Sequence, residues 1–183
     1  MFLGPPGSGK GTQAAALSQE LGVVNISTGD MLRSAVAAGS ELGRRVEGIM
    51  ASGALVGDDT MAEVVRARLQ RPDARPGFIL DGYPRTAAQA ETLSEILEEQ
   101  GTELDHVLLL EVPEDELVER MTSRAEVEGR ADDREEVIRE RLRVYRRNTE
   151  PLIDHYRQAG LLRPVDGNRT IDEVAASLRS IFA

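Results

Sequence analysis

The stretch GPPGSGKGTQ, residues 4–13, constrains the fold of this chain more than any other feature of its sequence. It follows a short apolar run at 1–3 and leads into a helical pattern that begins at Lys10. A glycine-rich turn between a strand and a helix lets successive backbone N–H groups point inward at phosphate oxygens, and the helix N-terminus adds its positive end. The stretch therefore predicts a phosphate-binding loop at the start of an α/β fold.

Lys10 is the only lysine of the chain, and the other 21 of its 22 basic residues are arginines. A compact ammonium on a flexible stem can follow the β- and γ-phosphates of a nucleotide into a cramped site, where a planar guanidinium fits less well. The strict pattern G-x-x-x-x-G-K-[ST] is not fully met, because Gly11 stands at the Ser/Thr position and Thr12 follows it. The loop still predicts a nucleotide site centred on Lys10.

Composition excludes several classes of function. The net charge of −10 argues against nucleic acid or an anionic membrane as a partner. The chain has no cysteine, so disulfides, thiol nucleophiles and cysteine-bound zinc are excluded, and the two histidines are expected to be structural. Neither a signal-peptide pattern nor an 18-residue apolar run occurs, which predicts a cytoplasmic protein.

Continuous apolar runs alternate with helical patterns along the chain. The predicted strands lie at 1–3, 23–26, 77–82, 106–112 and 161–165. Such runs are typical of strands covered on both faces, so they predict a doubly wound, parallel, five-stranded sheet. The helix at 85–101 is predicted to end at Gly101, and the helix at 170–182 to open with a capping box between Thr170 and Glu173.

Two stretches do not fit this alternation. Residues 27–56 have the pattern of two helices between strands, which predicts a small helical insertion. Residues 124–135 have almost no apolar content and predict a short, solvated, mobile loop, although their arginine spacing suggests more than a surface turn. The core is then expected to comprise 1–26, 57–123 and 136–183.

Four ordered motifs carry a family resemblance that covers nearly the whole chain. After GPPGSGKGTQ come ISTGDMLR at 26–33, LDGYPRTAAQ at 80–89 and GRADDREEVIRERLRVY at 129–145. In this order and spacing they resemble the adenylate kinases of the nucleoside monophosphate kinase family. The resemblance implies a monomer with a core, an AMP-binding insertion at 27–56 and a short lid at 124–135. It also implies the reaction of Mg·ATP with AMP to give two ADP.

The resemblance assigns roles to residues at the matching positions. It implies ATP contacts for the loop and for three later arginines: Gly7, Ser8, Gly9, Lys10, Gly11, Thr12, Arg120, Arg124 and Arg169. It implies AMP contacts for the later motifs and a stretch between them: Thr28, Arg33, Ala54, Leu55, Val56, Gly82, Tyr83, Pro84, Arg85, Gln89, Arg130 and Arg141. Those expected to be catalytic are Lys10, Arg85, Arg124, Arg130 and Arg141.

Asp81 is the candidate metal ligand. It ends an apolar strand, and a carboxylate there can hold Mg²⁺ through water, because Mg²⁺ keeps much of its hydration. An ordinary turn or N-cap aspartate is the alternative. Longer lids of the family sometimes hold zinc on cysteines, so none is expected on this short, cysteine-free lid.

Three other functions compete with this hypothesis. Kinases of UMP or CMP typically carry Ala where Thr28 stands and Asn where Gln89 stands, so both positions here are of the adenine type. A GTPase-type switch needs an N-K-x-D motif, for which the chain has no second lysine. A catalytically silent nucleotide-binding scaffold is expected to have lost arginines that this chain keeps.

Overall fold

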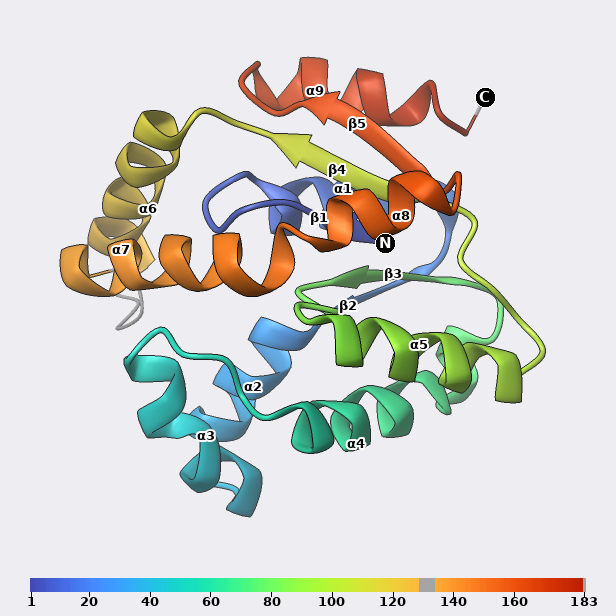
Figure 1. Cartoon of the computed structure of the whole chain (residues 1–183), viewed down its shortest axis with the longest axis horizontal. Helices are drawn as coiled ribbons and strands as arrows, with labels where there is room; N and C mark the ends of the chain where they lie inside the picture. The colour runs from blue at the N-terminus through green and yellow to red at the C-terminus, as the bar shows by residue number, and fades with distance from the viewer. Residues whose placement is uncertain (129–133, 183) are drawn as a thin grey trace.

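The computed structural model describes residues 1–128 and 134–182, and its strands are parallel (Figure 1). The strands found there are β1 (Phe2–Leu3), β2 (Val24–Ser27), β3 (Phe78–Asp81), β4 (Val107–Glu111) and β5 (Leu162–Asp166). The predicted α/β fold with a parallel sheet is confirmed. Its strands form two hydrogen-bonded sheets, β1-β4-β5 and β2-β3, rather than the single five-stranded sheet expected. The reason lies in the length of β1. Its two residues pair with Leu108 and Leu109 of β4, and a strand this short does not form a second ladder on its other side.

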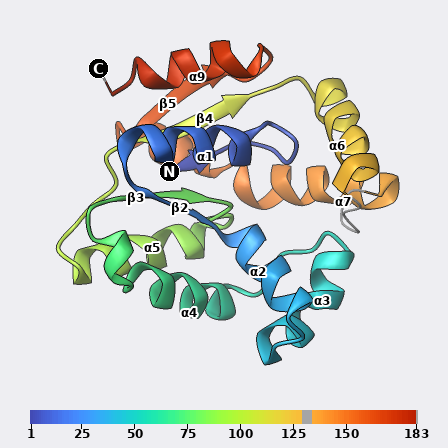
Figure 2. The same cartoon turned by 180° about the vertical axis from the view of Figure 1, so that it is seen from behind.

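Helices cover both faces of these strands. They are α1 (Lys10–Leu21), α2 (Thr28–Ala37), α3 (Glu41–Ala51), α4 (Asp58–Leu69), α5 (Ala87–Glu99), α6 (Glu114–Glu128), α7 (Glu135–Val144), α8 (Leu152–Gln158) and α9 (Ile171–Arg179), with the short 3-10 helix η1 (Pro72–Ala74) and the π-helix η3 (Tyr145–Thr149). Helix α8 lies in front of the strands in Figure 1, and α1 lies in front in the reverse view of Figure 2. The alternation of strands and helices thus gives the doubly wound arrangement.

The strands separate two of the three apolar clusters found among the described residues, and the third joins α6 to α7. Along β4, Val107 and Leu109 pack with helices α4, α5 and α8, whereas Leu108 and Leu110 pack with α1 and α9. Successive side chains of a strand point to opposite faces, so a continuous apolar run supplies both clusters at once. This is why the buried strands show no polar alternation in the sequence.

The predicted insertion at 27–56 contains α2 and α3, which lie apart from the strands in Figure 1. Ser27 and Ser40 start these helices, each side chain accepting a hydrogen bond from a backbone N–H of the first turn. At Gly43 of α3, an added Cβ would stand 2.1 Å from the carbonyl oxygen of Ala35 in α2. Only glycine therefore allows this close helix contact.

The loop expected at 124–135 is wrong for its first five residues and its last one. Residues 124–128 continue α6, and α7 begins at Glu135. Low apolar content suggested a loop, but Arg, Ala and Glu are strong helix formers and need no buried face to extend an existing helix. Residues 129–133, including Arg130, lie outside the described part of the chain.

Two finer predictions on helix ends are confirmed. Thr170 and Glu173 form the reciprocal capping box at the start of α9. Gly101, with φ of +67°, follows the C-terminal end of α5. Over 1–128 and 134–182, the structure contains no helix that is long and apolar enough to cross a membrane.

Candidate functional site

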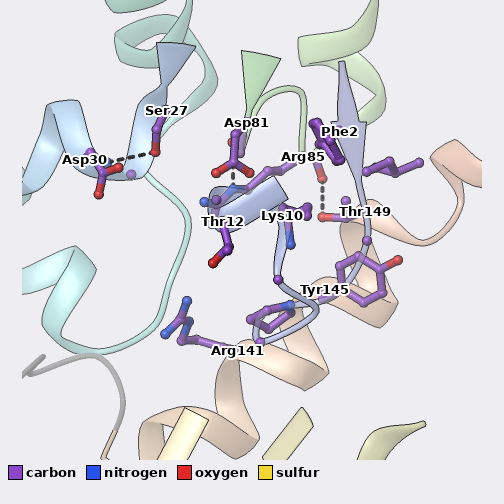
Figure 3. A pocket seen from close by; sticks show the side chains of 18 of the residues that line it. Phe2, Lys10, Thr12, Ser27, Asp30, Asp81, Arg85, Arg141, Tyr145 and Thr149 are labelled. Atoms are coloured by element: carbon purple, nitrogen blue, oxygen red, sulfur yellow. Dashed lines mark hydrogen bonds between the residues drawn. The ribbon is translucent and has the colours of Figure 1, made fainter. Parts of the chain in front are cut away.

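A cleft of about 330 Å³ opens where the carboxyl ends of β1, β2 and β3 meet. Its walls are the glycine loop, the start of α2, the segment after β3, and one face of α6, α7 and η3 (Figure 3). Ligands of open α/β sheets bind at this edge, because the loops that follow the strands gather there. The fold thus brings the four sequence motifs to one place.

The glycine loop is shaped by positions that only glycine fills easily, Gly4 and Gly9 among them. A Cβ on Gly4 would stand 2.7 Å from the carbonyl oxygen of Leu110, so the loop can leave β1 close to β4 only without a side chain. Gly9 caps α1 with a left-handed φ of +90°. The backbone N–H groups at the start of α1 therefore face the cleft, as a phosphate site requires.

Lys10 reaches back over the loop. Its Nζ donates to the carbonyl oxygen of Pro5 at 2.7 Å and to Oγ of Ser8 at 3.3 Å. Burial lowers the pKa of Lys10 to about 8; Asp81 raises it, and Arg85, Arg141 and Arg124 lower it further. The ammonium is held where positive charge is dense, which suits a polyanionic ligand.

Asp81 stands opposite the first turn of α1. Its carboxylate oxygen would lie 3.6 Å from a Cβ on Gly11, and its backbone carbonyl accepts from Oγ1 of Thr28 at 3.3 Å. No group of three or more His, Cys, Asp or Glu able to hold a metal occurs among the described residues. One carboxylate facing a phosphate loop fits a cation bound mainly through water, as Mg²⁺ is, rather than one enclosed by protein ligands.

Arg85 is fixed through its own backbone. Its N–H donates to Oε1 of Gln89 at 2.7 Å, and its carbonyl accepts from Oγ1 of Thr149 at 2.9 Å. Its Nε donates to the carbonyl oxygen of Gly82 at 2.8 Å. Both the main chain and the guanidinium are thereby oriented toward the cleft.

A second cavity of about 70 Å³ adjoins the cleft on the side of the insertion. Apolar side chains of α2, α3 and α4 line it together with the stretch 54–56. Its polar wall is formed by Thr28 and Gln89, which are 1% and 2% exposed. Arg33, Arg85 and Arg141 line both cavities.

The structure gathers most of the predicted site residues. The cleft holds Gly7, Gly9, Lys10, Gly11, Thr12, Arg33, Leu55, Asp81, Gly82, Pro84, Arg85, Arg124 and Arg141. The second cavity adds Thr28, Ala54, Val56 and Gln89.

Four predicted residues in the described chain line neither cavity. Ser8 is buried beneath Lys10, and the side chain of Tyr83 is buried in the core. Arg120 donates to the carbonyl oxygen of Gly167 at 3.1 Å, next to the loop that carries Arg169. Arg169 pairs with Glu173 at 3.1 Å. These two arginines therefore lie near the C-terminal end of β5 and outside both cavities.

The match to known proteins decides the family. The adenylate kinase family model matches residues 2–161. The chain belongs to the adenylate kinase family. The adenylate kinase of Thermus thermophilus is 54% identical over 180 residues, 98% of this chain and 94% of that protein. The adenylate kinases of Clavibacter michiganensis and Archaeoglobus fulgidus are 50% identical over 183 residues and 46% over 209; each comparison spans 100% of this chain, and 92% and 96% of those proteins.

Some residues in the cleft or beside the second cavity of this adenylate kinase family member were not foreseen. Ser27 and Asp30 had a local signal, because the serine precedes a helix and the aspartate lies in its first turn, where it pairs with Arg33 at 2.6 Å. Thr149, the last residue of the π-helix η3, had none, since its partner Arg85 is 64 residues away. Asp58, which accepts from Gln89, is 31 residues from it and gave no signal either.

Proposed function

We propose that this chain transfers the γ-phosphoryl group of ATP to AMP and so forms two ADP. The observation that carries this proposal is the pair of adjoining cavities with three arginines on their shared wall. The larger cavity contains the glycine loop and takes the triphosphate, and the smaller one takes the acceptor nucleotide. The γ-phosphoryl group then passes between them at Arg33, Arg85 and Arg141.

Phosphoryl transfer depends on positioning and charge stabilisation rather than on a protein nucleophile. Lys10 and the backbone N–H groups of the loop hold the β- and γ-phosphates of ATP. Arg85, fixed by Gln89 and Thr149, binds the AMP phosphate and the transferred group. Arg124 and Arg141, from α6 and α7, neutralise charge on the opposite side, and Arg130 is proposed to act with them.

Asp81 is the proposed residue for the metal that accompanies ATP. Asp81 would hold Mg²⁺ through water, and the ion would supply positive charge that stabilises the phosphates of ATP. On the same strand end, the carbonyl of Asp81 holds Oγ1 of Thr28, so the metal carboxylate and the base pocket share one rigid element.

The second cavity selects the acceptor base. Thr28 and Gln89 are its buried polar side chains, with backbone at 54–56 beside them. A pocket that hydrogen-bonds its ligand rejects bases that leave buried polar groups unpaired. AMP is therefore the proposed acceptor rather than UMP or CMP.

Closure of two segments over the nucleotides is part of the proposal. The insertion at 27–56 and Arg124 contribute to the wall of the cleft. Closure of the insertion and of the proposed lid at 124–135 would exclude water that hydrolyses ATP. A bisubstrate analogue should slow amide hydrogen exchange in α2, α3 and 124–128, while β3 and β4 remain protected with or without it. Equal exchange in the helices under both conditions would contradict closure.

The function is tested by measuring ADP formation from ATP with AMP, CMP or UMP as acceptor. AMP should give the highest kcat/KM by a wide margin. Preference for CMP or UMP would favour the related kinases, and ADP formation with none of the three would reject the proposal. A cytoplasmic monomer remains a prediction, and light scattering of the purified chain would test the monomer.

A further inference from the structure

The carboxamide of Gln89 is held on both of its sides. Its Oε1 accepts from the backbone N–H of Arg85 at 2.7 Å, and its Nε2 donates to Oδ1 of Asp58 at 2.8 Å. Asp58 comes from α4, whereas Arg85 and Gln89 belong to the segment after β3. Two elements far apart in the sequence therefore meet at one side chain in the wall of the second cavity.

This arrangement permits only one orientation of the amide. If the carboxamide turned over, its NH₂ group would face the N–H of Arg85 and its oxygen would face the carboxylate of Asp58. Donor would then oppose donor and acceptor would oppose acceptor, leaving buried groups unpaired. In the observed orientation, one N–H of Nε2 and one lone pair of Oε1 are not used by these bonds.

Asp58 is itself fixed within this network. Its Oδ1 also accepts from Oγ1 of Thr86 at 3.2 Å, and Oγ1 of Thr86 accepts from the backbone N–H of Gln89 at 3.1 Å. Thr86 is the N-cap of α5, so the network ties the start of α4 to the start of α5. The carboxylate is consequently part of a closed set of bonds rather than a solvated surface charge.

We propose that Asp58 is a positioning residue that sets the hydrogen-bonding direction of Gln89 and, through it, the backbone of Arg85. The inference rests on the proposed function, because it treats Gln89 as a reader of the acceptor base. Asp58 thereby helps to distinguish two kinds of purine. One has an exocyclic amino donor beside a ring-nitrogen acceptor, and the other has an exocyclic carbonyl acceptor beside a ring N–H donor. Adenine has the first arrangement and hypoxanthine has the second.

A simpler role for Asp58 is a helix-start residue. It lies in the first turn of α4, where a carboxylate is favoured by the helix dipole. Asp59 occupies the same turn and supplies a matched control, because it is exposed and has no hydrogen bond to Gln89. Substituting Asp59 removes the dipole contribution alone, whereas substituting Asp58 removes the bond to Gln89 as well.

The test compares AMP with IMP as acceptors in wild type, Asp58→Ala, Asp58→Asn and Asp59→Ala. With one side of the amide released, Asp58→Ala should lower the ratio of kcat/KM for AMP over IMP by about tenfold or more. KM for ATP should stay within about twofold of wild type in every variant, because Asp58 lies outside the cleft that holds the loop. Asp58→Asn, whose Oδ1 can accept the same two bonds, and Asp59→Ala should both keep the wild-type ratio.

An unchanged ratio in Asp58→Ala, or an equal loss in Asp59→Ala, would overturn the inference. If Asp58→Ala does not fold, as circular dichroism would show, Asp58→Ser replaces it. Its shorter side chain suits a helix start but cannot reach Gln89, so the same fall in the ratio is expected. A wild-type chain that forms no ADP from ATP and AMP would instead reject the proposed function, which the same assay distinguishes.

Discussion

The two cavities, the cleft at the phosphate end and the second cavity at the base end, hold their polar side chains in opposite ways. At the phosphate end, Lys10, Arg85, Arg124 and Arg141 gather around one space, and burial together with the neighbouring arginines lowers the pKa of Lys10 to about 8. At the base end, Gln89 is buried and bonded on both sides, to Asp58 and to the backbone of Arg85.

The polar side chains of the two ends therefore contribute differently to the stability of the fold. Cations gathered at the phosphate end repel one another, and a bound phosphate chain offsets that repulsion. The polar side chains of the base end are hydrogen-bonded to other protein groups. These bonds stabilise the fold, and we propose that they also select the acceptor base. Substitutions at the two ends should therefore differ in their effects on stability and on kinetics.

The largest effect is expected from Lys10→Met. Loss of the charge beside the phosphates should lower kcat/KM on the order of 10²-fold or more. Folding lowers the pKa of Lys10 from 10.5 to about 8, so the unfolded chain binds more protons than the native state between these pH values. Below pH 8 the charged lysine therefore lowers the free energy of unfolding, and the substitution removes this cost. The free energy of unfolding at pH 7, measured with urea, should accordingly not decrease. Near-normal turnover, or loss of the fold, would contradict this account.

The pH dependence of the phosphate end should be visible in kcat/KM, which reports the free enzyme. The protonated form of Lys10 binds phosphate, so activity should be present below its pKa of about 8 and fall as the pH rises through that value. In Lys10→Arg this alkaline decline should be absent, because a guanidinium stays protonated. A decline of the same midpoint in both enzymes would assign it to another group.

At the base end, Thr28→Val should change selection more than turnover. The substitution removes the hydroxyl that donates to the carbonyl of Asp81 at 3.3 Å, and it makes the wall of the second cavity less polar. The ratio of kcat/KM for AMP over CMP should fall by about tenfold, from the loss of one buried hydrogen-bonding group. Thr28→Ser retains the hydroxyl and should keep the ratio. Equal ratios in the two variants would separate Thr28 from base selection.

The smallest effect is expected from Tyr83→Phe. The hydroxyl of Tyr83 is buried with no hydrogen-bond partner among the described residues, and burial raises its pKa to about 12. Removing it should leave the free energy of unfolding unchanged or raise it by up to about 1 kcal/mol, since an unpaired buried group is lost. Its side chain lines neither cavity, so kcat/KM for AMP should not change. A clear loss of AMP activity would support the sequence-based assignment of Tyr83 to the acceptor site.

The phosphate end could be predicted from sequence because its determinants are local. The loop from Gly4 to Lys10 is contiguous, and its glycines and lysine indicate both backbone shape and ligand charge. The apolar runs and the pair Thr170–Glu173 are local in the same sense, and the strands and the capping box lie near their predicted positions.

The support of the base end could not be predicted in this way. The bonds from Gln89 to Asp58 and from Thr149 to Arg85 span 31 and 64 residues, and no local pattern marks either partner. The error at 124–128 has a local cause instead, because α6, which packs through Leu117 and Met121, continues into polar residues that are good helix formers. Sequence motifs predicted most of the side chains that line the two cavities, while tertiary contacts determine how those side chains are oriented.

The contact at Gly43 has a mechanical consequence for the insertion. Because α2 and α3 meet there with no space for even one methyl group, neither helix can slide along the other. If the insertion closes as proposed, α2 and α3 would therefore move together as one stiff lever. A probe placed on α3 will therefore report the angle of α2 as well, and any side chain introduced at position 43 would loosen the lever rather than lengthen its stroke.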